Sequence, residues 1–206
     1  SRWNGCFWRP AWGAEGPAAR MSRDTVLSTI AGPAGPIACA VDTPTQRTEG
    51  PQGVAVLCHP HPQHGGTMDN KVVQTLARAA LALGYLAVRF NFRGVGGSAG
   101  AWDEGRGEVD DALAVVAHFR QAGQPLALAG FSFGGYVAAR AAAALADTPA
   151  GAPERLVLVA PASSRFGVGE VPAHTLVVHG EADEVVPLAA TLDWARPQQL
   201  PVLVLP

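Results

Sequence analysis

The stretch LALAGFSFGG, residues 126–135, decides the fold of this chain. Its apolar first half predicts a buried strand, and the alanine-rich run Tyr136–Leu145 that follows predicts a helix. Between them, Gly130, Ser132 and Gly134 form the pattern G-x-S-x-G, which in a strand–turn–helix context holds a serine hydroxyl above the carboxyl end of a sheet. The alternative is a chance turn in a chain with 24 Gly and 17 Pro. The context favours a serine nucleophile at residue 132.

Composition places the chain among single-domain globular proteins. Its 206 residues carry a net charge of −2, with 15 basic and 17 acidic residues and no basic block that would indicate a nucleic-acid partner. No apolar run approaches the length of a membrane span. The three cysteines, Cys6, Cys39 and Cys58, fit neither a disulfide framework nor a zinc pattern. A reducing cytoplasmic location is therefore expected.

The segment Ser1–Arg20 differs from the rest of the chain, because it contains three of the five tryptophans among glycine, proline and arginine. It has no apolar core of the kind found in signal peptides. We expect it to be a non-native or disordered extension, with the domain over residues 21–206. The alternative is a genuine arm whose tryptophans pack on a groove or on a partner.

Strand and helix patterns alternate along the remaining sequence. Beside the strand that begins at Leu126, the predicted strands are Thr25–Ile30, Ile37–Val41, Gly53–Cys58, Tyr85–Asn91, Arg155–Ala160, Thr175–His179 and Pro201–Leu205. Beside Tyr136–Leu145, the predicted helices are Met68–Leu83, Glu108–Gln121 and Leu188–Ala195. Two strands followed by this alternation predict an α/β three-layer sandwich, a hairpin leading into a mostly parallel twisted sheet with helices on both faces.

Four motifs stand in a fixed order along the chain. They are HPHP with GGTMDN (59–62 and 65–70), FNFRGVGGS (90–98), GFSFGG (130–135) and HGEADEVVP (179–187). This order resembles the α/β-hydrolase superfamily, and most of all its small single-domain bacterial esterase-like members with a dienelactone-hydrolase-like pattern. The resemblance runs from about residue 25 to residue 206 and implies the α/β-hydrolase fold.

The resemblance also implies roles for single residues. The nucleophile position falls on Ser132, and the acid position, in the loop after a later strand, falls on Asp183. A carboxylate there orients the base histidine and stabilises its imidazolium form. Glu181 and Glu184 are the rival carboxylates, which we expect to be solvated.

An oxyanion hole of this type uses two backbone N–H groups. One belongs to the residue after the nucleophile, Phe133, and the other comes from the loop after the histidine-containing strand. His61 is the expected donor there, because its neighbours Pro60 and Pro62 have no N–H.

The expected substrate pocket is small and open. Phe131, His59 and Trp102 are its candidate lining residues, although core packing is the alternative for such side chains. The connection after Ala160 is short, roughly Pro161 to Pro172, and leaves no room for the cap domain often inserted there. An open site favours esters of short acyl chains over long-chain lipids.

The base histidine is the main departure from the pattern. In the family it follows the last strand, and this sequence has no counterpart, so we interpret the chain as truncated before it. His64 or His61 could act as a substitute base. The remaining possibility is a catalytically impaired relative that binds or scaffolds.

The same loop invites a metal interpretation, since His59, His61 and His64 are closely spaced. The prolines and the match to the oxyanion loop explain the cluster without a metal, and we expect neither metal nor cofactor. Cys58 beside His59 could suggest a thiol nucleophile, but its strand is predicted to be buried.

These observations predict a carboxylesterase-type serine hydrolase that acts through an acyl-enzyme on Ser132. An amidase, peptidase, thioesterase or acyltransferase on the same nucleophile remains an alternative. The expected partner is a small-molecule ester, with no nucleic acid and no membrane. The last strand could expose an apolar edge, which makes a homo-oligomer possible.

Overall fold

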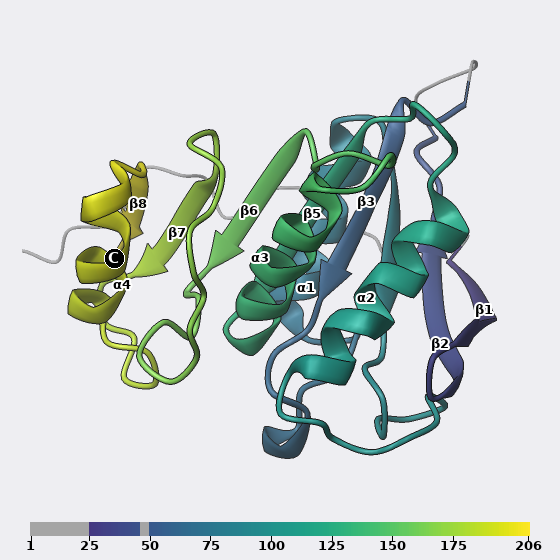
Figure 1. Ribbon diagram of the computed structural model, residues 1–206, viewed down its shortest axis with the longest axis horizontal. Helices are drawn as coiled ribbons and strands as arrows, with labels where there is room; N and C mark the ends of the chain where they lie inside the picture. The colour runs from purple at the N-terminus through teal and green to yellow at the C-terminus, as the bar shows by residue number, and fades with distance from the viewer. Residues whose placement is uncertain (1–24, 46–49) are drawn as a thin grey trace, which may run out of the picture.

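A computed structural model describes residues 25–45 and 50–206, so the extension expected over Ser1–Arg20 lies outside the described residues. Eight strands form one sheet in the order β1-β2-β4-β3-β5-β6-β7-β8 (Figure 1). Their bounds are Val26–Gly32, Gly35–Asp42, Gly53–Cys58, Tyr85–Phe90, Leu126–Phe131, Arg155–Val159, Leu176–Gly180 and Val202–Leu205 for β1 to β8. Each strand lies within two residues of the prediction at either end.

Strand direction follows the predicted topology. β1 and β2 form an antiparallel hairpin, and β2 pairs antiparallel with β4. All the strands from β3 to β8 are parallel to one another. The carboxyl ends of these six strands therefore meet at one edge of the sheet, and the loops that follow them gather there.

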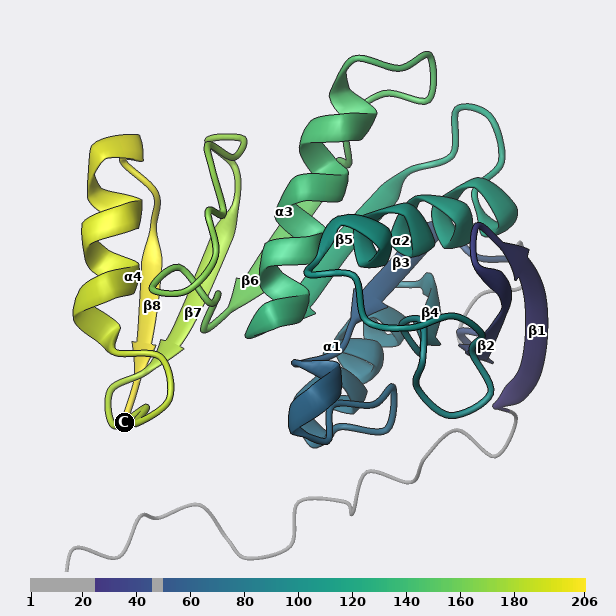
Figure 2. The same ribbon diagram turned by 60° about the horizontal axis from the view of Figure 1, so that its bottom comes forward.

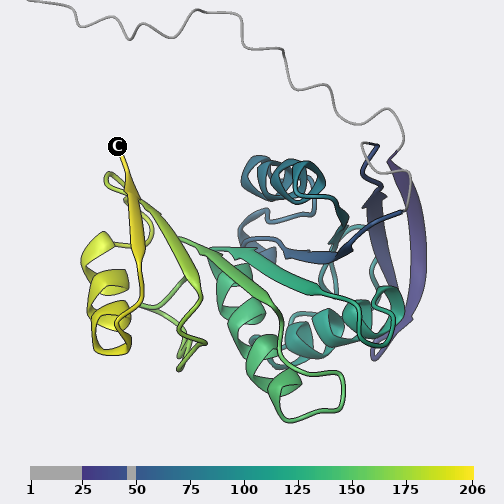
Figure 3. The ribbon, with the colours of Figure 1, turned by 90° about the horizontal axis from the view of Figure 1, so that it is seen from above.

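Helices cover both faces of the sheet, as predicted. α1 (Lys71–Ala82) lies on one face, and α2 (Arg106–Phe119), α3 (Phe133–Ala146) and α4 (Leu188–Ala195) lie on the other (Figure 3). Two short 3-10 helices, η1 (Pro62–His64) and η2 (Arg196–Gln198), complete the described elements. The chain thus has the three-layer α/β sandwich that the sequence predicts.

Three helix starts differ from the prediction, and that of α2 does so by two residues, at Arg106 rather than Glu108. α1 begins at Lys71 rather than Met68, because the side chain of Asn70 caps it by accepting a hydrogen bond from the Val72 N–H at 2.9 Å. α3 begins at Phe133, three residues before the predicted Tyr136. The nucleophile candidate Ser132 is therefore the residue directly before the helix.

The central strands are buried because they are covered from both sides. Every residue of β3 is buried, and β5 packs beside it with its side chains between α1 and α3. The edge strand β8 contrasts with them: Leu203, Val204 and Leu205 are 51%, 40% and 47% exposed. This edge is where the expectation of self-association would apply.

No cap domain interrupts the described fold. Between β6 and β7 the chain forms only turns and loop over residues 160–175. Of the helices in residues 25–45 and 50–206, none has both the length and the apolar character needed to cross a membrane.

Candidate active site

Ser132 occupies a strained turn between β5 and α3. Its backbone angles are φ 54° and ψ −118°, a combination that a side-chain-bearing residue rarely adopts. The flanking glycines make the turn possible. A Cβ on Gly130 would lie 2.0 Å from the carbonyl oxygen of Gly134, and one on Gly134 would lie 2.2 Å from that of Cys58. The G-x-S-x-G pattern is thus a steric requirement of this turn.

Hydrogen bonds from β6 and its following loop hold the Ser132 backbone. The Ser132 N–H donates to the Val159 carbonyl at 2.9 Å, and the Ser132 carbonyl accepts from Gly135 at 2.9 Å and Ala162 at 3.2 Å. The residue is partly exposed at the carboxyl edge of the sheet. Its hydroxyl is therefore presented on a fixed backbone, as a nucleophile requires.

Two backbone N–H groups near Ser132 lack a protein acceptor in the described part of the chain. Phe133 is the first residue of α3, where an N–H has no intrahelical partner. His61 immediately precedes η1, and its carbonyl accepts from the N–H groups of His64 and Gly66, at 3.0 Å each. These two bonds fix the turn that follows His61. The N–H groups of His61 and Phe133 both remain available as candidate oxyanion donors.

His59 holds this loop in place and does not line a pocket. Its Nδ1 donates to the Pro60 carbonyl at 2.6 Å and its Nε2 accepts from the Phe92 N–H at 3.1 Å. The side chain is 0% exposed, and burial lowers its pKa to about 4. The expectation that His59 contacts substrate is corrected here, because both ring nitrogens are already used and no face is open.

The far end of the same loop is tied to β4. Asn91 Oδ1 accepts from the Met68 N–H at 2.9 Å, while Arg89 donates to the Met68 carbonyl at 3.1 Å. Arg89 also pairs with Asp69 at 3.1 Å and with Asp42 at 3.3 Å.

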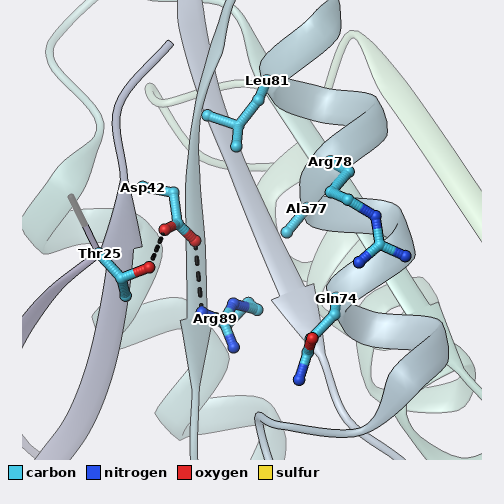
Figure 4. A pocket seen from close by; sticks show the side chains of 7 residues that line it. All are labelled: Thr25, Asp42, Gln74, Ala77, Arg78, Leu81 and Arg89. Carbon is cyan, nitrogen blue, oxygen red and sulfur yellow. Dashed lines mark hydrogen bonds and ion pairs between the residues drawn. The ribbon is translucent and has the colours of Figure 1, made fainter. Parts of the chain in front are cut away.

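Asp42 lies between Thr25 and Arg89 beside a cavity of about 30 Å³ (Figure 4). Sequence reasoning missed Arg89 as an anchor, although a lone arginine within an apolar strand was the available signal.

An aromatic cluster surrounds the His61 ring. Ring centroids lie 4.4 Å away for Trp102, 5.2 Å for Phe133 and 6.1 Å for Phe166. Phe133 is 0% exposed, so its ring belongs to the core. Trp102 and Phe166 are partly exposed and form the candidate pocket wall. Phe131, the third candidate, is also partly exposed but makes no ring contact with this cluster in the described chain. No pattern in the sequence indicates that the loop of Phe166 lies beside the nucleophile.

Buried charges support the segment that carries Trp102. Arg93 makes a two-pronged contact with Asp111, with N–O distances of 3.0 and 2.8 Å. The fully buried Glu108 accepts from the N–H groups of Asp103 at 3.0 Å and Gly105 at 2.8 Å. These bonds fix both ends of the turn after Trp102.

Asp183 lies just after β7, at the same edge of the sheet as Ser132. Its Oδ1 accepts from the N–H groups of Val185 and Val186 at 2.8 and 2.9 Å. The buried His179 Nε2 donates to the Val186 carbonyl at 2.9 Å and so joins β7 to the end of the loop that carries Asp183. Glu181 and Glu184 are exposed, as expected. Asp183 accepts a hydrogen bond from none of the histidines in the described chain.

The two candidate bases stack on each other. His61 and His64 have ring centroids 4.5 Å apart and an interplanar angle of 20°. Burial, followed by the charges of His64 and Arg165, lowers the pKa of His61. His61 Nδ1 is buried without a hydrogen-bond partner in residues 25–45 and 50–206. The neutral form of His61 is thus favoured, which is the form that accepts a proton.

The loop after β3 lies at the lower edge of the sheet in Figure 1, and Figure 2 shows it near the start of α3. The rings of His61 and Phe166, 6.1 Å apart, bring it close to the loop after β6. No group of three or more potential metal-binding side chains occurs among the described residues. The thiol of Cys58 is buried, and burial raises its pKa far above the ordinary value. At this edge of the sheet, Ser132 is therefore the candidate nucleophile.

Comparison with known proteins gives a consistent result. Residues 49–168 match the family model described as serine aminopeptidase S33. An α/β serine hydrolase without a lid from Xanthomonas campestris is 42% identical, with a TM-score of 0.80 over 90% of this chain and 85% of that one. An α/β serine hydrolase homologue from Coxiella burnetii is 38% identical, with a TM-score of 0.76 over 90% and 88%.

A curated relative matches a shorter region. An uncharacterized protein of Rickettsia prowazekii is 44% identical over 88 residues, which cover 41% of this chain and 37% of that protein. The match thus spans little more than a third of the Rickettsia protein.

Proposed function

The chain belongs to the serine aminopeptidase S33 family of α/β serine hydrolases, and from this premise we propose that it cleaves carboxylic esters of short acyl chains through Ser132. The observation that carries the proposal is the strained Ser132 turn, with φ 54° and glycines on both sides. Strain of this kind is held at a site only where the surrounding structure enforces it.

The proposed reaction begins with attack of Ser132 Oγ on the ester carbonyl. The N–H groups of Phe133 and His61 stabilise the oxyanion of the tetrahedral intermediate. Collapse of the intermediate releases the alcohol and leaves an acyl-enzyme on Ser132, which water then hydrolyses. Asp183 is the proposed acid, because it follows β7 at the same sheet edge as Ser132 and two backbone N–H groups hold its Oδ1 in place.

The base in this chain is proposed to be His61 or His64. His61 is the stronger candidate, because its ring contacts Phe133, the neighbour of the nucleophile, and its pKa is lowered. Proton transfer by a positioned histidine typically contributes about 10²–10⁴-fold to a rate. A chain in which neither histidine reaches Ser132 would retain only the catalysis due to the oxyanion hole and binding.

The preference for short acyl chains rests on the open site. The loop over residues 160–175 contributes no lid, and the apolar side chains of Trp102 and Phe166 near the His61 ring are only partly covered. Long acyl chains need an enclosed apolar pocket, which binds most of a ligand's surface.

The test compares hydrolysis of 4-nitrophenyl acetate, butyrate and decanoate by the unaltered chain and by Ser132→Ala. Ser164→Ala is the matched control, since Ser164 is exposed on the loop after β6. We expect activity on acetate and butyrate that disappears with Ser132→Ala and persists with Ser164→Ala. Equal activity in Ser132→Ala and the unaltered chain would refute the proposal.

The rival activities are separated by the same protein samples. An aminoacyl 4-nitroanilide tests for a peptidase or amidase, and an acyl thioester tests for a thioesterase. An acyltransferase would divert the acyl group to an added alcohol in competition with water. A binding or scaffold protein would hydrolyse none of these and would not be labelled at Ser132 by a fluorophosphonate.

A further inference from the structure

Two loops near the Ser132 turn carry basic side chains. His61 and His64 belong to the loop after β3, and Arg165 belongs to the loop after β6. The second loop is bonded to the nucleophile residue, since the Ala162 N–H donates to the Ser132 carbonyl at 3.2 Å. The Arg165 N–H then donates to the Ala162 carbonyl at 3.1 Å. The backbone of Arg165 is thus two hydrogen bonds away from that of Ser132.

Phe166 completes the contact between the two loops. Its N–H also donates to the Ala162 carbonyl, at 3.0 Å, and its ring centroid lies 6.1 Å from that of His61 and 5.1 Å from that of Phe133. Arg165 therefore lies next to a residue whose ring packs in the aromatic cluster around His61. Its side chain is exposed and free to meet a ligand at this edge.

Two basic groups influence His61. His64 and Arg165 are the charged groups that act on it, and both disfavour its protonation. Arg165 forms no ion pair with any carboxylate of the described chain, whereas Arg89 in β4 and Arg93 in the loop after it are both paired. An exposed guanidinium without a counter-charge, on a loop that is bonded to the nucleophile residue, favours binding of an anion.

We propose that the substrate is an ester that carries a carboxylate close to its scissile bond, with Arg165 as the main contact. This inference rests on the proposed function. Guanidinium groups match carboxylates in shape and bind them through two parallel hydrogen bonds. The partly exposed rings of Trp102 and Phe166 would contact the apolar part of such a molecule.

The kinetic test uses matched neutral and charged esters. The first pair places the charge on the alcohol side and compares 4-acetoxybenzoate with 4-acetoxybenzamide. The second pair places the charge on the acyl side and compares mono-4-nitrophenyl adipate with methyl 4-nitrophenyl adipate. We expect kcat/KM for the charged member of at least one pair to be about tenfold higher, as one charge-assisted contact provides. Arg165→Gln should bring that ratio close to one.

Arg155→Gln is the matched control, because Arg155 is also exposed but begins β6, at the opposite end of the strand from the loop that carries Arg165. It should keep the preference of the unaltered chain. Ratios near one in both ester pairs, or a preference that survives Arg165→Gln, would overturn the inference while leaving the proposed function intact.

A binding measurement separates failure of this inference from failure of the proposed function. In calorimetry on Ser132→Ala, benzoate should bind more tightly than benzamide, and Arg165→Gln in that background should remove the difference. Should no ester be hydrolysed while this benzoate preference is present, the proposed function is wrong and the anion site stands. Equal binding of benzoate and benzamide, together with neutral esters being hydrolysed as well as charged ones, would rule out the anion site alone.

Discussion

The buried imidazole of His59 accepts a hydrogen bond from the backbone N–H of Phe92 at 3.1 Å while donating to the Pro60 carbonyl at 2.6 Å. This pair of bonds joins the end of β3 to the residues after β4 and fixes the start of the loop that carries His61. The arrangement requires a neutral ring, since a protonated imidazole has no acceptor nitrogen. Burial accordingly lowers the pKa of His59 to about 4.

Acid should destabilise the protein through His59. In the unfolded chain His59 takes up a proton near pH 6.5, whereas in the folded chain it does so only near pH 4. Between these pH values the unfolded state therefore binds more protons than the folded state. The contribution of His59 to stability is therefore complete above pH 6.5 and is lost as pH falls to about 4. The free energy of unfolding should fall by about 3 kcal/mol in total, at 1.36 kcal/mol per pKa unit. Urea unfolding at several pH values measures this free energy.

The exposed His118 supplies the control for this pH dependence. His118→Gln should leave the slope of unfolding free energy against pH unchanged between pH 4 and 6.5, and His59→Asn should flatten it. An identical slope in His59→Asn would mean that another group is responsible for the acid sensitivity.

Gly134→Ala should disrupt the site from within the core. The added methyl group would lie 2.2 Å from the Cys58 carbonyl oxygen and 2.5 Å from that of His59, both of them backbone atoms that cannot rotate away. Separation of α3 from β3 would cost about 1–3 kcal/mol or more. Thermal unfolding should show a lower Tm than that of the unaltered chain. Gly167→Ala is the control, because nothing lies within 4 Å of a Cβ there, and it should unfold at the unaltered temperature.

The same close packing explains why the start of α3 differed from the sequence prediction. Phe133, Gly134 and Gly135 have weaker helix propensity than the alanines after them, so local preference pointed to Tyr136. Close packing at Gly134 and Gly135 overrides that preference, since an added Cβ would lie 2.2 Å from the Cys58 carbonyl oxygen and 3.2 Å from the Pro161 Cα, respectively. Strand positions were easier to predict, because β3 and β5 are short apolar runs bounded by glycine, proline and polar residues.

The candidate site was predictable to the extent that motifs mark it. Ser132 and the loop of His61 stand in recognisable patterns, and the structure places both at the carboxyl edge of the sheet. The roles of His59 and Arg89 depend on hydrogen bonds to residues about 20 to 50 positions away in the chain. Such partners are fixed by tertiary packing, and a histidine beside a loop gives no sign of whether it faces substrate or backbone.

The Arg89–Asp42 pair should be important for stability. The side chains are 4% and 7% exposed, so Asp42→Asn would leave the guanidinium in a buried position with only the exposed Asp69 as counter-charge. Removal of one partner from a buried pair typically costs about 3–5 kcal/mol. Chemical denaturation should show a loss of this size. The solvent-exposed pair of Arg106 and Asp103 is the comparison, and Asp103→Asn should cost less than about 1 kcal/mol. Similar losses in the two variants would contradict the importance of the buried pair.

Trp102 should matter for substrate binding more than for folding. Its ring lies 4.4 Å from His61 and 5.0 Å from Phe133, and it is partly exposed. Trp102→Ala removes an aromatic wall and should lower kcat/KM for 4-nitrophenyl butyrate about tenfold, whereas Trp102→Phe should retain most of it. Trp194→Phe is the control, because the Trp194 indole bonds to the Gly169 carbonyl away from the His61 cluster. Unchanged kinetics in Trp102→Ala would place the substrate on another part of the site, and the remaining candidate wall would then be Phe131 and Phe166.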